Sequence, residues 1–131
     1  MNTFRKEERL CSKKSLDLLF KNGSSFLLYP FRVSYLFVDE VQTYPAQVVI
    51  NVSKKRYKHA VDRNLIKRRI REAYRLQKQE LLYAELLERS DLLLLSLQYV
   101  GKKKYEYTFL EKKMMLVLKK LIVQTKENET N

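Results

Sequence analysis

The chain has 131 residues, 45% of them hydrophobic and 32% charged, which excludes a disordered chain and predicts one domain over residues 1–131. A formal net charge of +12 indicates a polyanionic partner, with nucleic acid favoured over a membrane surface. A single cysteine, Cys11, excludes an internal disulfide and a cysteine-based zinc site.

No apolar run approaches the length of a membrane span, so we expect no membrane partner. Charged residues stand where a signal peptide needs its apolar segment, which predicts a cytoplasmic protein. Residues 1–9 are predicted to be a flexible basic arm. Residues 12–20 follow as a short helix, which Gly23 ends because glycine readily takes the left-handed conformation.

Strands are expected over residues 31–38 and 46–52, and together they favour an antiparallel hairpin. In the first, alternation places Phe31, Val33 and Tyr35 on one face and the intervening residues on the other. The aromatic stretch that begins at Phe26 leaves open whether a third strand forms there.

The C-terminal half predicts one more strand and one more helix. Residues 79–90 either extend a preceding helix or form another short one. Residues 91–99 are nearly all apolar, as expected of a central strand covered on both faces. Residues 105–123 form an amphipathic helix, and residues 126–131 a frayed tail. The order α-β-β-(β)-α-β-α predicts an α+β sandwich with helices packed on a small sheet.

The most informative stretch is residues 54–78, where eleven Lys and Arg residues against two acids give a net charge of +9. On a helix, one face collects polar and basic side chains and the other collects apolar ones. The first set is Asn64, Lys67, Arg68, Arg71, Arg75 and Lys78, and the second is Ile66, Ile70, Ala73 and Tyr74. Because like charges at this spacing repel, a polyanion-binding face is favoured over a solvated one.

Residues for independent catalysis are not found. The one histidine, His59, has no carboxylate placed to orient it, so a structural or RNA-contacting imidazole is favoured over a general base. Two acid pairs, at residues 7–8 and 39–40, fall in the predicted arm and in a turn, where magnesium ligands are not expected. With two glycines there is no Gly-rich phosphate loop. We therefore predict a binding protein without catalytic or metal-binding residues of its own.

The segment from Val52 to Arg75 resembles the protein subunit of bacterial ribonuclease P. That family has a V-S-K-K segment followed by A-V-x-R-N-x-x-K-R-x-x-R-E. The matching residues here are Ser53, Lys54, Lys55, Ala60, Val61, Arg63, Asn64, Lys67, Arg68, Arg71 and Glu72. The family's N-terminal helix, later strand and C-terminal helix also have counterparts, so the resemblance covers some 110 residues.

The resemblance implies a left-handed crossover between two strands through the basic helix. It also implies removal of the 5′ leader from precursor tRNA by a catalytic RNA subunit, which holds the Mg²⁺ and joins one protein molecule. The residues expected to contact RNA are Lys54, Lys55, Arg63, Asn64, Lys67, Arg68, Arg71 and Arg75.

The family binds the leader in a cleft between the first helix and the sheet, which implies roles for Phe20, Tyr35 and Leu16. Phe20 matches a cleft aromatic and Tyr35 a sheet tyrosine, whereas Leu16 replaces a second aromatic. A core position for Phe20 remains the alternative. The chain also departs from the family at Val49, commonly glycine, and in a longer connection over residues 56–59.

Two other classes remain as alternatives to this interpretation. A structural RNA-binding protein of the ribosome shares the size and charge, but not the signature. A stand-alone nuclease is the third hypothesis.

Overall fold

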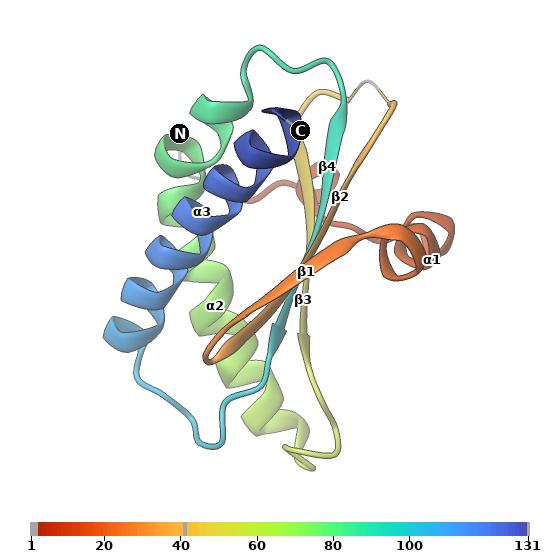
Figure 1. The fold of residues 1–131 in the computed structure, drawn as a ribbon. Helices are drawn as coiled ribbons and strands as arrows, with labels where there is room; N and C mark the ends of the chain where they lie inside the picture. The colour runs from red at the N-terminus through yellow and green to blue at the C-terminus, as the bar shows by residue number, and fades with distance from the viewer. Residues whose placement is uncertain (1–2, 41, 131) are drawn as a thin grey trace.

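A computed structural model describes residues 3–40 and 42–130 of the chain (Figure 1). The ends of the predicted arm and tail, residues 1–2 and 131, lie outside the described residues. In chain order the elements are η1 Lys6–Glu8, α1 Lys13–Asn22, β1 Ser24–Leu28, β2 Phe31–Val38, β3 Ala46–Val52, α2 Ala60–Leu81, η2 Tyr83–Leu86, β4 Leu92–Tyr99 and α3 Tyr107–Thr130. The predicted α+β sandwich is confirmed, including the third N-terminal strand.

The four strands form one sheet in the order β1-β2-β4-β3. Strand β4 runs antiparallel to β2 and parallel to β3. The predicted hairpin between β2 and β3 is therefore wrong, because β4 lies between them. Its six consecutive buried residues, 92–97, need cover on both faces, and a central position provides that cover. Helix α2 joins the parallel pair β3 and β4, and the handedness of this crossover stays an implication of the family.

Helices α2 and α3 lie side by side on one face of the sheet, and α1 lies on the other (Figure 1). The main core fills the first interface, where Phe31, Val33 and Tyr35 alternate inward from β2. A smaller cluster under α1 contains Leu10, Leu19, Leu92 and Leu94. Because α1 is short, it covers only one end of its sheet face. None of the described helices combines the length and apolarity needed to cross a membrane.

The predicted arm is folded in its described part. Glu8 is buried, Leu10 donates its N–H to the carbonyl of Val48 at 2.9 Å, and Arg9 forms a bridge with the same strand residue. The prediction of a flexible arm was wrong because this charged segment is held by contacts with residues far away in the sequence, such as Val48. The C-terminal helix is also longer than expected, since α3 continues to Thr130.

Gly23 ends α1 for a reason other than the predicted one. Its φ is −74°, which any residue adopts. A Cβ at this position would lie 2.4 Å from the carbonyl oxygen of Leu19 and 2.9 Å from that of Tyr35. Glycine is needed because the chain passes too close to β2 for any side chain.

Candidate RNA-binding surfaces

Helix α2 has the two faces that its sequence predicts. Ile66, Ile70, Ala73 and Tyr74 are at most 1% exposed and pack into the main core. On the opposite side Asn64, Arg68 and Arg71 are exposed, and Lys67 is half-buried. Burying one face fixes the helix rotation, so the remaining cations project together into solvent.

The connection between β3 and α2 carries Lys54 and Lys55, both exposed. Ser53 shapes it, because its hydroxyl accepts the N–H of Lys55 at 3.1 Å. Arg63 donates through Nη1 to the carbonyls of Tyr57 at 2.9 Å and Lys58 at 2.8 Å. Arg63 was predicted to contact RNA, and the structure places its guanidinium on this connection. These two hydrogen bonds fix the end of the connection to the first turn of α2.

Two further arginines of α2 have intramolecular partners. Arg75 forms an ion pair with Glu72 at 2.5 Å, and this hydrogen bond lowers the pKa of the Glu72 carboxyl. Arg69 points to the side of α3, where it donates to the carbonyl of Tyr105 at 2.7 Å. The exposed part of the predicted polar and basic face therefore consists mainly of Asn64, Arg68 and Arg71.

Lys78, predicted as the last residue of the basic face, is 2% exposed and does not belong to it. Its ammonium pairs with the carboxylate of Glu8 and donates to the carbonyl of Thr3. Tyr83 donates to the same carboxylate at 2.5 Å. No local pattern could reveal this cluster, because Glu8 lies 70 positions away in the sequence. The N-terminal segment, folded back over the last turns of α2, covers Lys78.

Of the residues expected to bind the leader, Phe20 is 61% exposed on α1, so the alternative of a core position is wrong. Its role in leader binding stays a prediction. Leu16 is half-buried in the cluster under α1, beside Leu19. Tyr35 lies on the opposite sheet face, is 5% exposed and donates to Oε1 of Gln124 at 3.2 Å. The prediction for Tyr35 is wrong, because alternation along β2 points it to the α3 side.

The sheet face on the α1 side carries polar side chains in its remaining rows, and these are exposed to different degrees. Ser34 of β2 is opposite Ser96 of β4, and one row further Gln98 lies between Arg32 and Asn51. Arg32 and Asn51 are exposed. Sequence reasoning missed this surface, although the alternation that placed Phe31 and Val33 inside already placed Arg32 and Ser34 outside. Small side chains, a guanidinium and amides suit a ribose-phosphate strand lying across the sheet.

We compared the chain with known protein families and solved structures. The sequence profile of the Ribonuclease P family matches residues 4–124. This chain belongs to the ribonuclease P protein family.

The ribonuclease P protein component of Porphyromonas gingivalis is 41% identical over 73 residues, 56% of this chain and 53% of that protein. That of Chlorobium phaeobacteroides is 42% identical over 88 residues, covering 62% and 58% of the two chains. This chain therefore spans about half the length of the curated relatives that it matches. The Staphylococcus aureus RNase P protein superposes with a TM-score of 0.66 at 25% identity, over 87% of this chain and 94% of that one. The Thermotoga maritima RNase P protein, at 22% identity and a TM-score of 0.67 over 86% and 96%, shares the fold.

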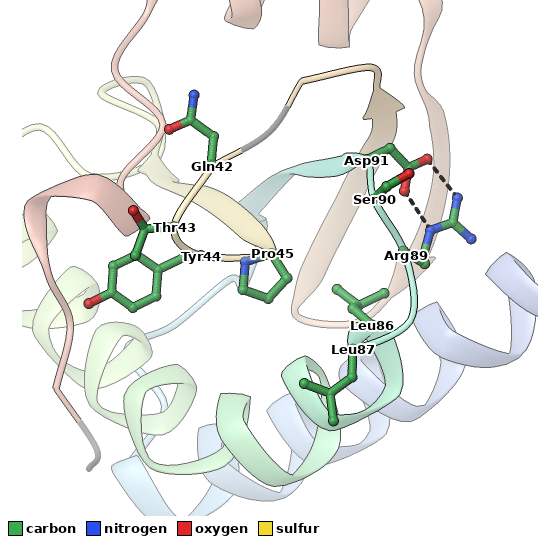
Figure 2. A pocket seen from close by; sticks show the side chains of 9 residues that line it. All are labelled: Gln42, Thr43, Tyr44, Pro45, Leu86, Leu87, Arg89, Ser90 and Asp91. Carbon is green, nitrogen blue, oxygen red and sulfur yellow. Dashed lines mark hydrogen bonds and ion pairs between the residues drawn. The ribbon is translucent and has the colours of Figure 1, made fainter.

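One pocket is separate from both surfaces of this ribonuclease P family member. It lies between the β2–β3 connection and the residues after η2, and Figure 2 shows its lining of Gln42, Thr43, Tyr44, Pro45, Leu86, Leu87, Arg89, Ser90 and Asp91. Its one cation, Arg89, donates twice to Asp91 at 2.9 Å and lies 3.6 Å from the ring centre of Phe37. The pocket thus offers little positive charge to a nucleic acid. Within residues 3–40 and 42–130, no three His, Cys, Asp or Glu side chains gather as a metal site.

Proposed function

We propose that this chain is the RNA-binding protein subunit of ribonuclease P, which assists a catalytic RNA subunit in removing the 5′ leader from precursor tRNA. The observation that carries this proposal is the division of α2 into a buried apolar side and an exposed polar side that holds residues of the family signature. Ile66, Ile70, Ala73 and Tyr74 bury one side of the helix, whereas the signature residues Asn64, Arg68 and Arg71 share one exposed face. A ribosomal protein explains the charge, but not the family match over residues 4–124.

We assign a different RNA to each of the two surfaces. The exposed face of α2, with Lys54 and Lys55 beside it, binds the RNA subunit, because guanidinium forks and ammonium groups suit phosphates. The polar sheet face on the α1 side, together with Phe20, binds the leader. A ring that is 61% exposed can stack on any base, and the exposed Arg32 and Asn51 of the sheet contact the strand without demanding one sequence.

The chain supplies binding energy and electrostatics rather than a reacting group. Each phosphate that it neutralises releases counterions and reduces the repulsion between the RNA subunit and the precursor. Binding the leader adds affinity that mature tRNA lacks, so product release is favoured over substrate release. We propose that the RNA subunit holds the Mg²⁺ ions for hydrolysis and that one RNA and one protein form the complex.

A cleavage assay with precursor tRNA tests the function. The protein alone, the cognate RNA subunit alone and the two together are compared at low Mg²⁺ concentration. We expect cleavage at the 5′ end of the mature tRNA to rise only when both are present. Cleavage by the protein alone would support a stand-alone nuclease, and no stimulation of the RNA would support a ribosome-type binding protein.

Phe20→Ala tests the leader surface separately. We expect affinity for precursor tRNA to fall by about 1–3 kcal/mol, the usual contribution of one base stacked on an aromatic ring. Affinity for mature tRNA and the melting temperature should hardly change, because the side chain is exposed. Leu18→Ala is the matched control, since Leu18 is also exposed on α1, at 39%. Equal losses for precursor and mature tRNA would exclude Phe20 from the leader site.

A further inference from the structure

The connection between β4 and α3, residues 100–106, has no helix or strand, yet side chains from other elements fix its backbone. The hydroxyl of Tyr57 donates to the carbonyl of Gly101 at 2.9 Å, and Tyr29 accepts the N–H of Lys102 at 2.9 Å. The hydroxyl of Tyr99 donates to the carbonyl of Lys103. These contacts hold the connection in one conformation without using a lysine side chain.

Gly101 allows this arrangement. A Cβ on it would lie 2.4–2.8 Å from atoms at the hydroxyl end of Tyr99. The chain therefore passes directly over that ring, which only glycine permits. At the end of the connection, Arg69 of α2 donates to the carbonyl of Tyr105 at 2.7 Å, so the segment is also fixed to α2.

Three aromatic rings form a row beside this connection. Tyr29, in the turn between β1 and β2, is 38% exposed and lies edge-to-face with Tyr105 at 5.9 Å. Tyr105 in turn stacks on Phe109 at 4.4 Å. The hydroxyl of Tyr105 donates to that of Tyr29 at 3.1 Å, so the outermost ring is held in place. A fixed, exposed aromatic ring is a surface on which a base can stack at little entropic cost.

Several cationic side chains lie in and next to this connection. Lys102, Lys103 and Lys104 are exposed, and Arg56 and Lys58 are exposed in the neighbouring β3–α2 connection. Figure 1 shows both connections at the same end of the molecule, beside the start of α2. Lys104 has an ion pair with Asp62 at 3.0 Å, whereas the ammonium of Lys103 lies 5.2 Å from the centre of the Tyr105 ring. Consecutive lysines on a rigid backbone repel one another, which an anionic ligand relieves.

We propose that Tyr29 and residues 102–103 form a further RNA site, distinct from the face of α2 and from the α1 side of the sheet. The site takes an unpaired nucleotide: the base stacks on Tyr29, and the flanking phosphates contact Lys102 and Lys103. It extends the cationic surface of Lys54 and Lys55 around the end of the molecule. The inference rests on the proposed function, because the strand belongs either to the RNA subunit or to the leader.

The double variant Lys102→Gln/Lys103→Gln tests the phosphate contacts. Lys112→Gln/Lys119→Gln is the matched control, because both control lysines are exposed on α3 and the charge lost is equal. Affinities for the cognate RNA subunit, and of the assembled complex for precursor and mature tRNA, are measured over a range of salt concentrations. We expect the first variant to reduce the slope of log affinity against log salt by about 1.4, or 0.7 for each phosphate contact. The control should leave the slope nearly unchanged.

The same measurements identify the source of the strand. A loss in binding of the RNA subunit assigns the site to that RNA, and a loss confined to precursor tRNA assigns it to the leader. Equal changes in the two double variants, or no change in either, would overturn the proposal. Wild-type protein in the cleavage assay provides the separate control for function. If it stimulates the RNA subunit while the two variants behave alike, only this further site is excluded; if it does not, both proposals fail.

Two substitutions of Tyr29 separate stacking from support of the connection. Tyr29→Phe keeps the ring and removes the hydroxyl that accepts the N–H of Lys102. Tyr29→Ala removes both. A stacked base predicts about a tenfold loss of RNA affinity for Tyr29→Ala and a loss below threefold for Tyr29→Phe. Equal losses for the two variants, accompanied by equal decreases in melting temperature, would show that Tyr29 only supports the backbone.

Discussion

The middle and the C-terminal end of α2 both carry basic side chains, but these differ in burial. Arg68 and Arg71 lie in the exposed middle of the helix, whereas Lys78, two turns later on the same side, is 2% exposed. The difference lies in what covers the helix: residues 3–10 cross its last turns and bring Glu8 against Lys78. Position on a helix face thus shows which side chains point the same way, but not whether solvent or another segment meets them.

The buried end also differs in how its charge is balanced. Lys78 has an ion pair with Glu8, a hydrogen bond to the carbonyl of Thr3 and the ring of Phe4 centred 5.3 Å away. Glu8 accepts from the N–H of Arg5 at 2.6 Å as well. Removing such charges from water is costly unless every donor and acceptor is used, so this end depends on its partners in a way that the exposed face does not.

The largest expected effect follows from breaking the buried pair. Lys78→Met keeps the apolar stem but leaves Glu8 buried without its cation, and should destabilise the fold by about 3–5 kcal/mol. Arg71→Ala, at the exposed face, should change stability by less than about 0.5 kcal/mol. Urea denaturation followed by circular dichroism measures both. The double variant Glu8→Leu/Lys78→Met should recover part of the loss, because it removes both charges. A small effect of Lys78→Met together with weaker RNA binding would place Lys78 on the RNA surface instead.

Acid should affect the same end of the helix. Burial raises the pKa of Glu8, but hydrogen bonds from the Arg5 N–H, Lys78 and Tyr83 outweigh it, and the net pKa lies below the ordinary 4.5. The folded state therefore binds this proton less readily than the unfolded state. The resulting stability is present above the unfolded pKa and is lost as the pH falls through the lowered folded value. Denaturation curves from about pH 7 to about pH 3 should show this loss. In Glu8→Gln the slope of stability against pH should be smaller, and an unchanged slope would show that other carboxylates cause it.

The comparison also explains what could be predicted from the sequence. Periodicity correctly placed Ile66 and Ile70 inside and Arg68 and Arg71 outside, because burying one helix face is a local consequence of composition. Likewise, the apolar run of residues 92–97 correctly predicted a central strand.

What failed depended on contacts between distant segments. The burial of Lys78 requires Glu8, and the separation of β2 from β3 requires β4, which follows both in the sequence. The error at Tyr35 was avoidable: the resemblance assigned it to the leader cleft, but the predicted alternation already placed it with Phe31 and Val33. Phe20 could not be decided, since a helix of ten residues with several apolar side chains does not show which of them the sheet covers.

In the exposed middle of α2, single arginine substitutions should distinguish the effect of position on the helix from that of net charge. Arg68→Ala and Arg71→Ala should each weaken binding to the RNA subunit and reduce the salt slope by about one unit. Arg69→Ala removes the same charge, but its guanidinium donates to the carbonyl of Tyr105, so the salt slope should change less. Affinity titrations at several salt concentrations provide the measurement. Equal effects of the three substitutions would show that the face of α2 is irrelevant and that net charge alone matters.

The smallest effect is expected at Arg75, which forms an ion pair with Glu72 of the same helix. Arg75 follows Arg71 on the same side of α2, but Glu72 lies 2.5 Å away and offsets its charge. Arg75→Ala should therefore reduce RNA affinity by less than about threefold, since it also releases a carboxylate next to the RNA. Glu72→Gln should tighten binding by a similar factor. In the Glu72→Gln background this carboxylate no longer offsets the charge of Arg75, so there Arg75→Ala should reduce RNA affinity more than it does in the wild type. If instead Arg75→Ala already equals Arg71→Ala in the wild type, the RNA displaces Glu72 and the ion pair exists only in the free protein.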